Sequence, residues 1–415
     1  MIHPKLKLDQ SLKLYEEALD LVPGAVLGIR RPYNFIQGEY PIFFEKGKGG
    51  RVFDVDGNEY IDMLCAYGPI IIGHREQAID DAVVEQIREK GFCFSLTQPY
   101  QNLLAQTLRE LIPSAEQSLF LATGSDATTA AIRIARASTG RTKILRCGYH
   151  GWHDWCVEVH GGIPQKVYED VHEFHFNDLE GFESLMSKYG DEVAAVIITP
   201  IGHPLGEPIE EPLPGFLEAI RSTTEKYGTV LIFDEIRTGF RVHLGGAQAL
   251  YGVTPDLSVF GKAMANGYAI SAVVGKKSVM KVAEKEVFIS STFFPNSLAY
   301  VAALKTIDFL KSHKVIEHIN HRGGYFLANL KRAVADSGFL AQVSGIPSMA
   351  FITFPRDSEG LYKKLRTEFY TQTIRRGLFI QPFHHGYIAY RHTDDDLSQA
   401  VQIVRDSLDA LKKVN

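Results

Sequence analysis

A lysine stands at the end of an apolar segment in the second half of the sequence. Lys262 follows the run Leu257–Phe260 and Gly261, and small residues and glycine come after it. Lysine is rarely buried unless it has a partner or a task. Removal from water beside another cationic centre lowers the pKa of an amine, which makes the amine a usable nucleophile and base. We therefore interpret Lys262 as a catalytic residue, with a surface lysine at a strand end as the alternative.

Two consecutive carboxylates end a second apolar segment. The run Val230–Phe233 leads into Asp234 and Glu235, whose side chains point in opposite directions if the segment is a strand. One of them can then face a ligand while the other turns into the structure. A buried carboxylate needs a cationic or protonated partner, and a protonated pyridine nitrogen would serve for Asp234. Metal binding is the alternative, but no second acidic or histidine cluster stands at a suitable spacing.

Small residues stand between a third apolar segment and an alanine-rich helical pattern. Thr123 to Asp126 occupy this turn, and the N-terminus of a helix offers free N–H groups and a positive dipole end to a phosphate. Gly124 and Ser125 are therefore candidate phosphate-binding residues, although Ser125 would serve equally well as a plain helix cap. Tyr149 follows a further apolar segment. Its ring could lie flat on a pyridine ring or pack at the edge of the core.

The elements that must position these residues alternate between strand and helix. This alternation favours a mainly parallel sheet covered by helices on both faces. Ligands bind at the carboxyl ends of the strands in such sheets, so the phosphate turn, the acid and the lysine would meet there. Apolar runs predict strands at 118–121, 143–146, 194–199, 230–234 and 257–260, and amphipathic spacing predicts helices over 126–137 and 216–227.

The two ends of the chain have a different pattern. The N-terminal part predicts a helix over 12–21 and a hairpin around Asp56 and Gly57. A long helix over 298–312 leads into a mixed part with strands at 349–354 and 378–380. We expect a large α/β domain over 66–305 and a small α+β domain formed by residues 1–65 and 306–415.

Composition and charge exclude several classes of function. The 415 residues are 45% hydrophobic and carry a net charge of −5, so we expect neither nucleic acid nor a membrane as a partner. The apolar runs are far shorter than the roughly 20 residues that span a bilayer. The first residues lack an apolar signal core, and the cysteines lack paired spacing, which indicates a cytoplasmic protein with reduced thiols. His150, His153 and His160 lack the context of a zinc site, so no metal is expected.

Longer stretches of the sequence resemble a known family. The runs RVFDVDGNEYIDM (51–63), DEIRTGFRVHLGGAQ (234–248), YGVTPDLSVFGK (251–262) and HTDDD (392–396) stand close to the pattern of class III aminotransferases of fold type I. These enzymes use pyridoxal phosphate (PLP). The resemblance extends from Val22 to Asp396 and is greatest to glutamate semialdehyde aminomutases, with amino-sugar and aminoglycoside aminotransferases similar in overall pattern. It implies a large, mainly parallel seven-stranded sheet domain with a smaller α+β domain.

The resemblance assigns roles to individual residues. It implies that Lys262 carries PLP as a Schiff base and moves a proton, and that Asp234 pairs with the ring nitrogen. It also implies a homodimer with shared active sites, because one phosphate-binding threonine of the family comes from the neighbouring subunit. The further cofactor residues that it implies are Gly124 and Ser125 at the phosphate, Tyr149 and Ile236 on the two ring faces, and Thr292 from the neighbouring subunit.

Candidate substrate residues lie near both ends of the chain. The substrate-carboxylate arginine of the aminomutases falls at or next to Arg31, so Arg30 and Arg31 either pair with a donor carboxylate or form a structural pair. His384 and His385 replace a stretch that holds an acidic residue in the aminomutases. Arg391 stands where the family usually has a small residue. These changes predict a pocket for a hydroxylated or differently charged substrate.

Two departures from the aminomutase pattern bear on the reaction. Residues 152–174 form a shorter, more aromatic and more charged segment than the flexible loop that retains the aminomutase intermediate, and Thr199 replaces a glutamate. We therefore expect a ping-pong aminotransferase that moves an amino group from an amino-acid donor to an aldehyde or ketone acceptor. An aminomutase is the alternative. A binding protein that has only kept the fold is a third reading, against which Lys262 and Asp234 both argue.

Overall fold

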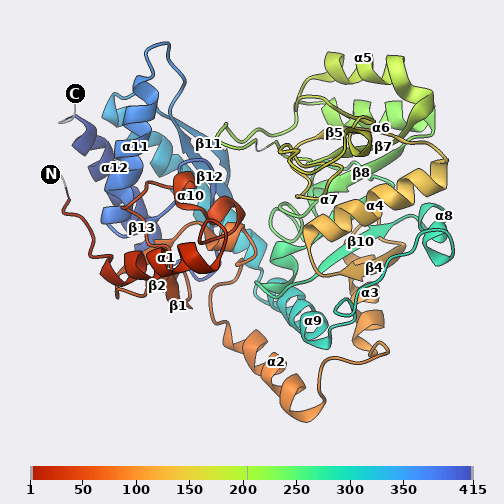
Figure 1. Ribbon diagram of the computed structural model, residues 1–415, viewed down its shortest axis with the longest axis horizontal. Helices are drawn as coiled ribbons and strands as arrows, with labels where there is room; N and C mark the ends of the chain where they lie inside the picture. Colours follow the sequence, from red (N-terminus) through yellow and green to blue (C-terminus); the bar gives the residue numbers. More distant parts are fainter. Residues whose placement is uncertain (1–2, 203, 413–415) are drawn as a thin grey trace. The chain divides into compact units, whose positions relative to one another are not determined.

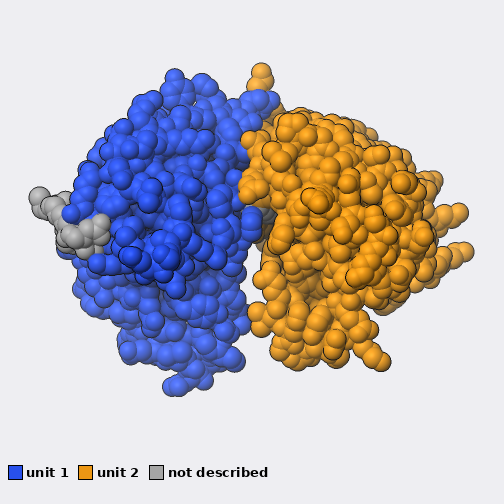
Figure 2. Space-filling model, turned by 90° about the horizontal axis from the view of Figure 1, so that it is seen from above, with its two compact units in different colours: residues 1–76, 203–209, 317–415 blue, residues 77–202, 210–316 orange. Residues whose placement is uncertain are grey.

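The computed structural model describes residues 3–202 and 204–412. The chain divides into two compact units, which are coloured separately in Figure 2. Unit 1 comprises residues 1–76, 203–209 and 317–415, and unit 2 comprises residues 77–202 and 210–316. The domain boundaries expected after residues 65 and 305 lie before these limits, and the sequence pattern did not assign the short segment 203–209 to the smaller part.

Unit 2 is built on a seven-stranded sheet with the strand order β4-β10-β9-β8-β7-β5-β6. Strand β10 runs antiparallel to both of its neighbours, and the remaining pairs are parallel. The expected α/β fold with a mainly parallel sheet is thereby confirmed. The strands are β4 (Gln117–Leu121), β5 (Lys143–Cys147), β6 (Val171–Glu173), β7 (Val193–Ile198), β8 (Val230–Asp234), β9 (Leu257–Phe260) and β10 (Ser271–Gly275).

Helices surround this sheet, and their ends follow local rules (Figure 1). Helix α4 begins with a capping box between Thr123 and Asp126 and ends at Gly140, which is left-handed with φ 68°. The α-helices are α2 (Gln77–Glu89), α3 (Tyr100–Leu111), α4 (Gly124–Thr139), α5 (Leu179–Tyr189), α6 (Phe216–Tyr227), α7 (Ala247–Tyr251), α8 (Lys277–Met280) and α9 (Ser297–Ser312). Short 3₁₀ helices cover Gln165–Val167, Gly190–Glu192, Lys262–Ala265 and Lys281–Glu284.

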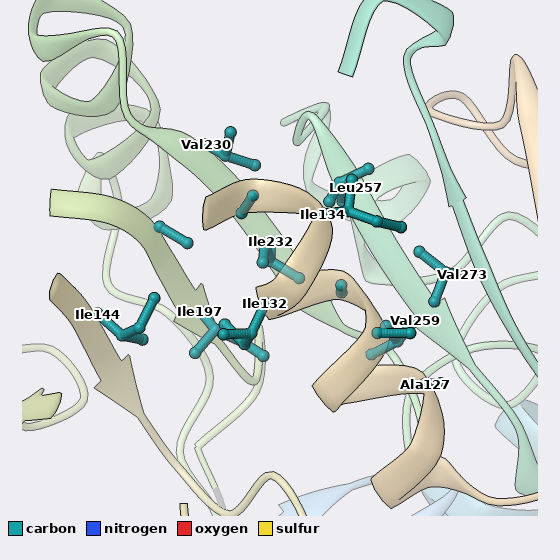
Figure 3. Close-up of a cluster of buried hydrophobic side chains, with 14 of the residues drawn as sticks. Ala127, Ile132, Ile134, Ile144, Ile197, Val230, Ile232, Leu257, Val259 and Val273 are labelled. Carbon is teal, nitrogen blue, oxygen red and sulfur yellow. The ribbon is translucent and has the colours of Figure 1, made fainter. Parts of the chain in front are cut away.

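The central strands are buried on both faces, as their continuous apolar runs predict. Along β8, Val230 and Ile232 pack into the core cluster that contains α4, whereas Leu231 and Phe233 pack into a second cluster that contains residues of α5 and α6. Figure 3 shows Ile132 and Ile134 of α4 over the side chains of the strands. This alternation also sends Asp234 and Glu235, the next two residues, in opposite directions.

Strands β6 and β10 were not expected from the sequence. Strand β6 has only three residues, and its middle position is a histidine. Strand β10 has the sequence SAVVG, which is too short for a periodic pattern to separate it from a loop. Its pairing with β4 and β9 depends on segments that are distant in the chain.

Unit 1 contains two small sheets. One has the order β1-β2-β3-β13, with the expected hairpin between β2 and β3, and the other has the order β11-β12-β14. A buried cluster that includes Tyr40, Val52, Tyr60, Ile374 and Phe379 joins the N-terminal and C-terminal segments within this unit. The elements are α1 (Asp9–Leu21), β1 (Phe44–Lys48), β2 (Arg51–Asp54), β3 (Glu59–Asp62), α10 (Val315–Ser337), β11 (Gln342–Ile346), β12 (Met349–Thr353), α11 (Leu361–Arg375), β13 (Leu378–Phe379), β14 (Gly386–Tyr387), α12 (Asp394–Leu411) and 3₁₀ helices Gly28–Arg30, Pro32–Asn34 and Cys65–Tyr67.

The part of the chain that the structure describes contains no helix long and apolar enough to cross a membrane.

The two-sided burial of the sheet predicts where truncation will matter. Val273 of β10 is fully buried, whereas Val159 is 79% exposed. The substitution Val273→Ala removes two buried methyl groups and leaves a cavity, so it should lower the free energy of unfolding by about 2 kcal/mol. Val159→Ala, the matched control, should change it by less than about 0.5 kcal/mol. Urea unfolding followed by circular dichroism measures both, and equal losses would contradict the assigned burial.

Candidate active site

Asp234 is buried at the carboxyl end of β8, where the side chain has a defined set of donors. The backbone N–H of Ile236 donates to Oδ1 at 3.1 Å, and Nδ1 of His150 lies 2.8 Å from Oδ2. A buried carboxylate is stabilised in its ionised form by such donors. From the sequence, His150 has a role only in the metal alternative, which is not expected. Its position directly after Tyr149, past the end of β5, was the available signal that it reaches the site.

His150 is itself held from several sides. Its side chain is completely buried, and the hydroxyl of Thr128 donates to its backbone carbonyl at 2.7 Å. Its ring lies nearly parallel to that of Trp155, with centroids 6.3 Å apart. With the proton on Nδ1 the imidazole donates to Asp234, and Nε2 is left as an acceptor with no partner among the described residues. His150 is therefore a positioning residue for the Asp234 carboxylate.

Glu235 takes the opposite direction, as the strand pattern predicted. Its carboxylate accepts a very short hydrogen bond from the hydroxyl of Thr238 and hydrogen bonds from the backbone N–H groups of Ala247 and Gln248. Complete burial raises the pKa of Glu235, and these donors oppose that shift. The carboxylate closes the N-terminus of α7 and fixes the turn that follows β8. Of the two acids, Asp234 is the one available to a ligand.

Lys262 lies one residue beyond β9 and its side chain is partly buried. Its backbone is left-handed, with φ 44°, a conformation that non-glycine residues rarely adopt. Burial lowers the pKa of the Lys262 amine well below its usual value, the positive charges of Arg237 and Arg241 lower it further, and Asp234 opposes them. A neutral amine at the end of a strand can attack an aldehyde carbon. The structure thus gives Lys262 the environment that the sequence suggested.

The first turn of α4 supplies the phosphate candidates. Thr123, not Ser125, caps this helix, and it satisfies the N–H of Asp126. The N–H groups of Gly124 and Ser125 precede any intrahelical acceptor, so they are available to an anion. The hydroxyl of Ser125 accepts a hydrogen bond from the N–H of Trp152 at 3.3 Å. This contact holds the phosphate turn against the loop that carries Tyr149 and His150.

Three glycines stand where the backbone packs closely around these residues. A Cβ at Gly124 would stand 3.2 Å from Cδ1 of Ile236, and one at Gly261 would stand 3.1 Å from the same atom. Ile236 thus packs tightly against two backbone segments. Gly151 has φ 116°, and a Cβ there would clash with the side chain of Ser125. These close approaches bring the first turn of α4, the turn after β8 and the residue before Lys262 together, and the free N–H groups at the start of α4 suit the phosphate of PLP.

Tyr149 and Thr292 have more open surroundings. Tyr149 is 58% exposed, whereas the next residue, His150, is buried. Thr292 lies in an exposed turn before α9, and Phe293 beside it is 66% exposed. Phe294 packs partly against the core of unit 2. Both Tyr149 and Thr292 remain predicted cofactor residues.

The predicted substrate residues all belong to unit 1, whereas the predicted cofactor residues belong to unit 2. Within unit 1, Tyr67 connects two of them. The Arg30 guanidinium lies 5.5 Å from the Tyr67 ring centroid, and the ring of His384 meets the same ring edge-on at 5.1 Å. Arg30 and Tyr67 also line a cavity of about 370 Å³. Nδ1 of buried His384 lies 2.9 Å from the carbonyl oxygen of His385.

The other two arginines are engaged within unit 1. Nε of Arg31 donates to the carbonyl of Val26 at 3.2 Å. The Arg391 guanidinium forms a two-point ion pair with Glu76, at 2.9 and 3.0 Å. Glu76 raises the pKa of Arg391. This pairing gives Arg391 a structural partner, and its role toward a substrate stays a prediction.

His153 and His160, for which a metal site was considered and not expected, have other contacts. Nδ1 of His153 lies 2.8 Å from the hydroxyl of Thr129, and the ring of His160 stacks on that of Tyr168 at 3.7 Å. Among the residues that the structure describes, no group of three or more His, Cys, Asp or Glu side chains could hold a metal ion.

Comparison with known proteins adds independent findings. Residues 35–408 match the family model described as aminotransferase class-III. The chain is 61% identical to the 3-aminobutyryl-CoA aminotransferase of Cloacimonas acidaminovorans over 99% of each chain. It is 34% identical to the glutamate-1-semialdehyde 2,1-aminomutase of Archaeoglobus fulgidus, over 97% of this chain and 100% of the other. The PLP internal aldimine form of FumI from Sphingopyxis sp. MTA144 has a TM-score of 0.92 at 28% identity, covering 97% and 96% of the two chains.

The surroundings of Lys262 predict a specific pH dependence in the cofactor-free protein. Burial lowers the pKa of Lys262 below its ordinary 10.5 and Asp234 raises it. Labelling of the amine by an acylating reagent should therefore be half-maximal well below pH 10.5, and Asp234→Asn should move that midpoint to still lower pH. Peptide mass spectrometry measures the extent of Lys262 labelling at each pH, with other lysine peptides of the same digest as internal controls. A midpoint in wild type like those of exposed lysines would refute the assignment.

Proposed function

The chain belongs to the class-III aminotransferase family, and on this basis we propose that it exchanges an amino group between an amino-acid donor and a 3-oxoacyl thioester. It is a PLP-dependent aminotransferase, as the family and its relatives indicate. The 61% identity to a 3-aminobutyryl-CoA aminotransferase carries the choice of substrate class. Removal of the amino group from the substrate in that relative's name leaves a ketone beside a thioester. L-Glutamate is the proposed donor.

The unit 2 residues would hold the cofactor in a defined way. Gly124 and Ser125 would bind the phosphate through their N–H groups at the start of α4. Asp234, held by His150, would accept a hydrogen bond from the ring nitrogen and keep it protonated. Tyr149 and Ile236 would cover the two ring faces, and Ile236 is already fixed by its glycine neighbours. When bound, PLP supplies an aldehyde carbon for the amine and an electron-withdrawing ring.

Lys262 does the proton chemistry in this proposal. Its amine would hold the cofactor through the aldehyde carbon and would be free again once a substrate amine is bound. Burial and nearby cations lower the pKa of this amine and so favour its neutral form, in which Nζ would remove the proton from the substrate carbon that bears the amino group. Thr128 and Ser125 hold the loop around His150, so the acid and the base keep their positions between the two half-reactions.

An aminomutase is the alternative that the sequence left open. The aminomutase relative is 34% identical, whereas the 3-aminobutyryl-CoA aminotransferase is 61% identical over almost the whole of both chains. Thr199, which stands where the family usually has a glutamate, is buried just after β7. It packs so closely against Gly148 that a Cβ atom at Gly148 would clash with its hydroxyl. Amine transfer between two molecules therefore has the stronger support.

Absorption spectra of the PLP-loaded enzyme test this function. L-Glutamate should convert the violet-edge cofactor band to a near-ultraviolet band, and 3-oxobutyryl-CoA should restore the first band. Lys262→Ala should lower turnover at least about 100-fold, because it removes the general base. Nitrogen-15 from labelled glutamate should appear in the product. Nitrogen retained within one substrate molecule would favour the aminomutase, and restoration only by hydroxylated aldehydes would refute the thioester.

A homodimer with shared active sites is part of the proposal. Thr292 and Phe293 are exposed in the single chain, and Phe288, shortly before them, is 79% exposed. Such an apolar surface beside a predicted phosphate ligand fits a subunit contact. Reduced cysteines, none of which is in a disulfide within the described chain, fit the proposed cytoplasmic location.

Subunit mixing tests the shared site. Thr292→Val should weaken PLP binding about tenfold, because it removes a hydrogen bond to a charged phosphate. A mixed dimer of Thr292→Val and Lys262→Ala subunits should contain one intact site, since Lys262 and Thr292 at that site come from different chains. Mixing the two weak variants at low PLP should therefore restore activity. A monomer in sedimentation, or no gain on mixing, would rule out the shared site.

A further inference from the structure

Arg237 is a cation of the active site to which no role has been assigned. It lies in the turn after β8, three residues beyond Asp234, and its side chain is partly buried. Within residues 3–202 and 204–412, its guanidinium has no hydrogen bond, ion pair or ring contact. A partly desolvated guanidinium without a counter-ion is unfavourable unless a ligand supplies the negative charge.

The backbone around Arg237 is rigid. Its predecessor, Ile236, packs against Gly124 and Gly261, and its successor, Thr238, is buried and hydrogen-bonded to the carboxylate of Glu235. The N–H of Arg241 donates to the carbonyl of Thr238 at 3.1 Å. Arg237 therefore starts from a fixed point beside the cofactor cradle.

Electrostatic effects place the Arg237 charge near the reacting groups. After burial, the charge of Arg237 is the largest cause that lowers the pKa of Lys262. The same charge also lowers the pKa of Tyr149, against the larger effect of burial. Among the described residues, the carboxylate that raises the pKa of Lys262 is that of Asp234, which is already held by His150 and Ile236. At the end of β7, the neighbouring strand, the side chain is the neutral hydroxyl of Thr199. Of the charged groups that act on the pKa of Lys262, two are thus cations and one is an anion.

We propose that Arg237 binds an anionic oxygen that a ligand brings into the pocket beside Lys262. The planar guanidinium suits a carboxylate, for which it offers two parallel N–H donors. Two ligands of the proposed reaction carry such an oxygen: the amino donor in its carboxylate, and the cofactor in the oxygen on its ring. The proposal rests on the proposed function for its choice of ligands, but anion binding itself is measurable without turnover.

The PLP-loaded enzyme carries the test, with Arg237→Met, Arg237→Lys and the exposed control Arg88→Met. Titration with glutarate, an unreactive dicarboxylate, gives a dissociation constant from the shift of the cofactor band. If the anion is the donor carboxylate, Arg237→Met weakens glutarate at least tenfold, Arg237→Lys retains part of the affinity, and Arg88→Met changes nothing. Thermal unfolding confirms that each variant is folded.

A pH titration of the cofactor absorption band tests the second candidate, the oxygen on the cofactor ring. If the anion is the ring oxygen, Arg237→Met raises the midpoint of that titration, because a cation that favours the deprotonated form is gone, while glutarate binds as before. If neither quantity changes in a folded Arg237→Met protein, the proposal is overturned. Loss of glutarate affinity in an enzyme that transfers no amine to any thioester would support Arg237 and refute the substrate class instead.

Discussion

The buried Asp234 carboxylate at the end of β8 needs hydrogen-bond donors, and the surrounding parts of unit 2 are arranged to supply them. The strand is apolar and buried along its whole length, and it brings the Asp234 carboxylate out of water with it. Such a charge needs donors or a cation close by. The chain provides an imidazole from the loop after β5 and one backbone N–H, and leaves room on the carboxylate for a further donor. The protonated ring nitrogen of the proposed cofactor would be that donor.

The same requirement explains the glycines around the site. The loop that carries His150 lies against the first turn of α4. Gly151 makes this possible, because a Cβ atom there would clash with the side chain of Ser125. The turn after β8 comes close to two other segments, and Gly124 and Gly261 leave Ile236 the space to pack between them. Glu235 then closes the N-terminus of α7 and holds this turn. The acid, base and phosphate cradle are thus linked through backbone contacts, not only through side chains.

Much of this could be read from local pattern. Apolar runs predict the central strands because those strands are buried on both faces, and the family resemblance identifies Lys262 and Asp234 at strand ends. The contact between His150 and Asp234 could not be predicted, because it joins residues 84 positions apart whose strands are separated by β7. Glu76, the partner of Arg391, is more distant still, and no local rule links them. Arg237 has no distinguishing local signal, because it stands inside the run 234–248, which resembles the family as a whole.

The discontinuous course of unit 1 has a consequence for biosynthesis. Strand β3 pairs in parallel with β13, and the cluster around Tyr60 is completed by Ile374 and Phe379 near the other end of the chain. A ribosome releases residues 1–76 long before residues 317–415 exist, and domains form as their segments become available. The N-terminal segment must therefore stay open, with its apolar face uncovered, while the whole sheet of unit 2 is translated. Its protection by chaperones during that interval matters more than for unit 2, whose segments emerge almost consecutively.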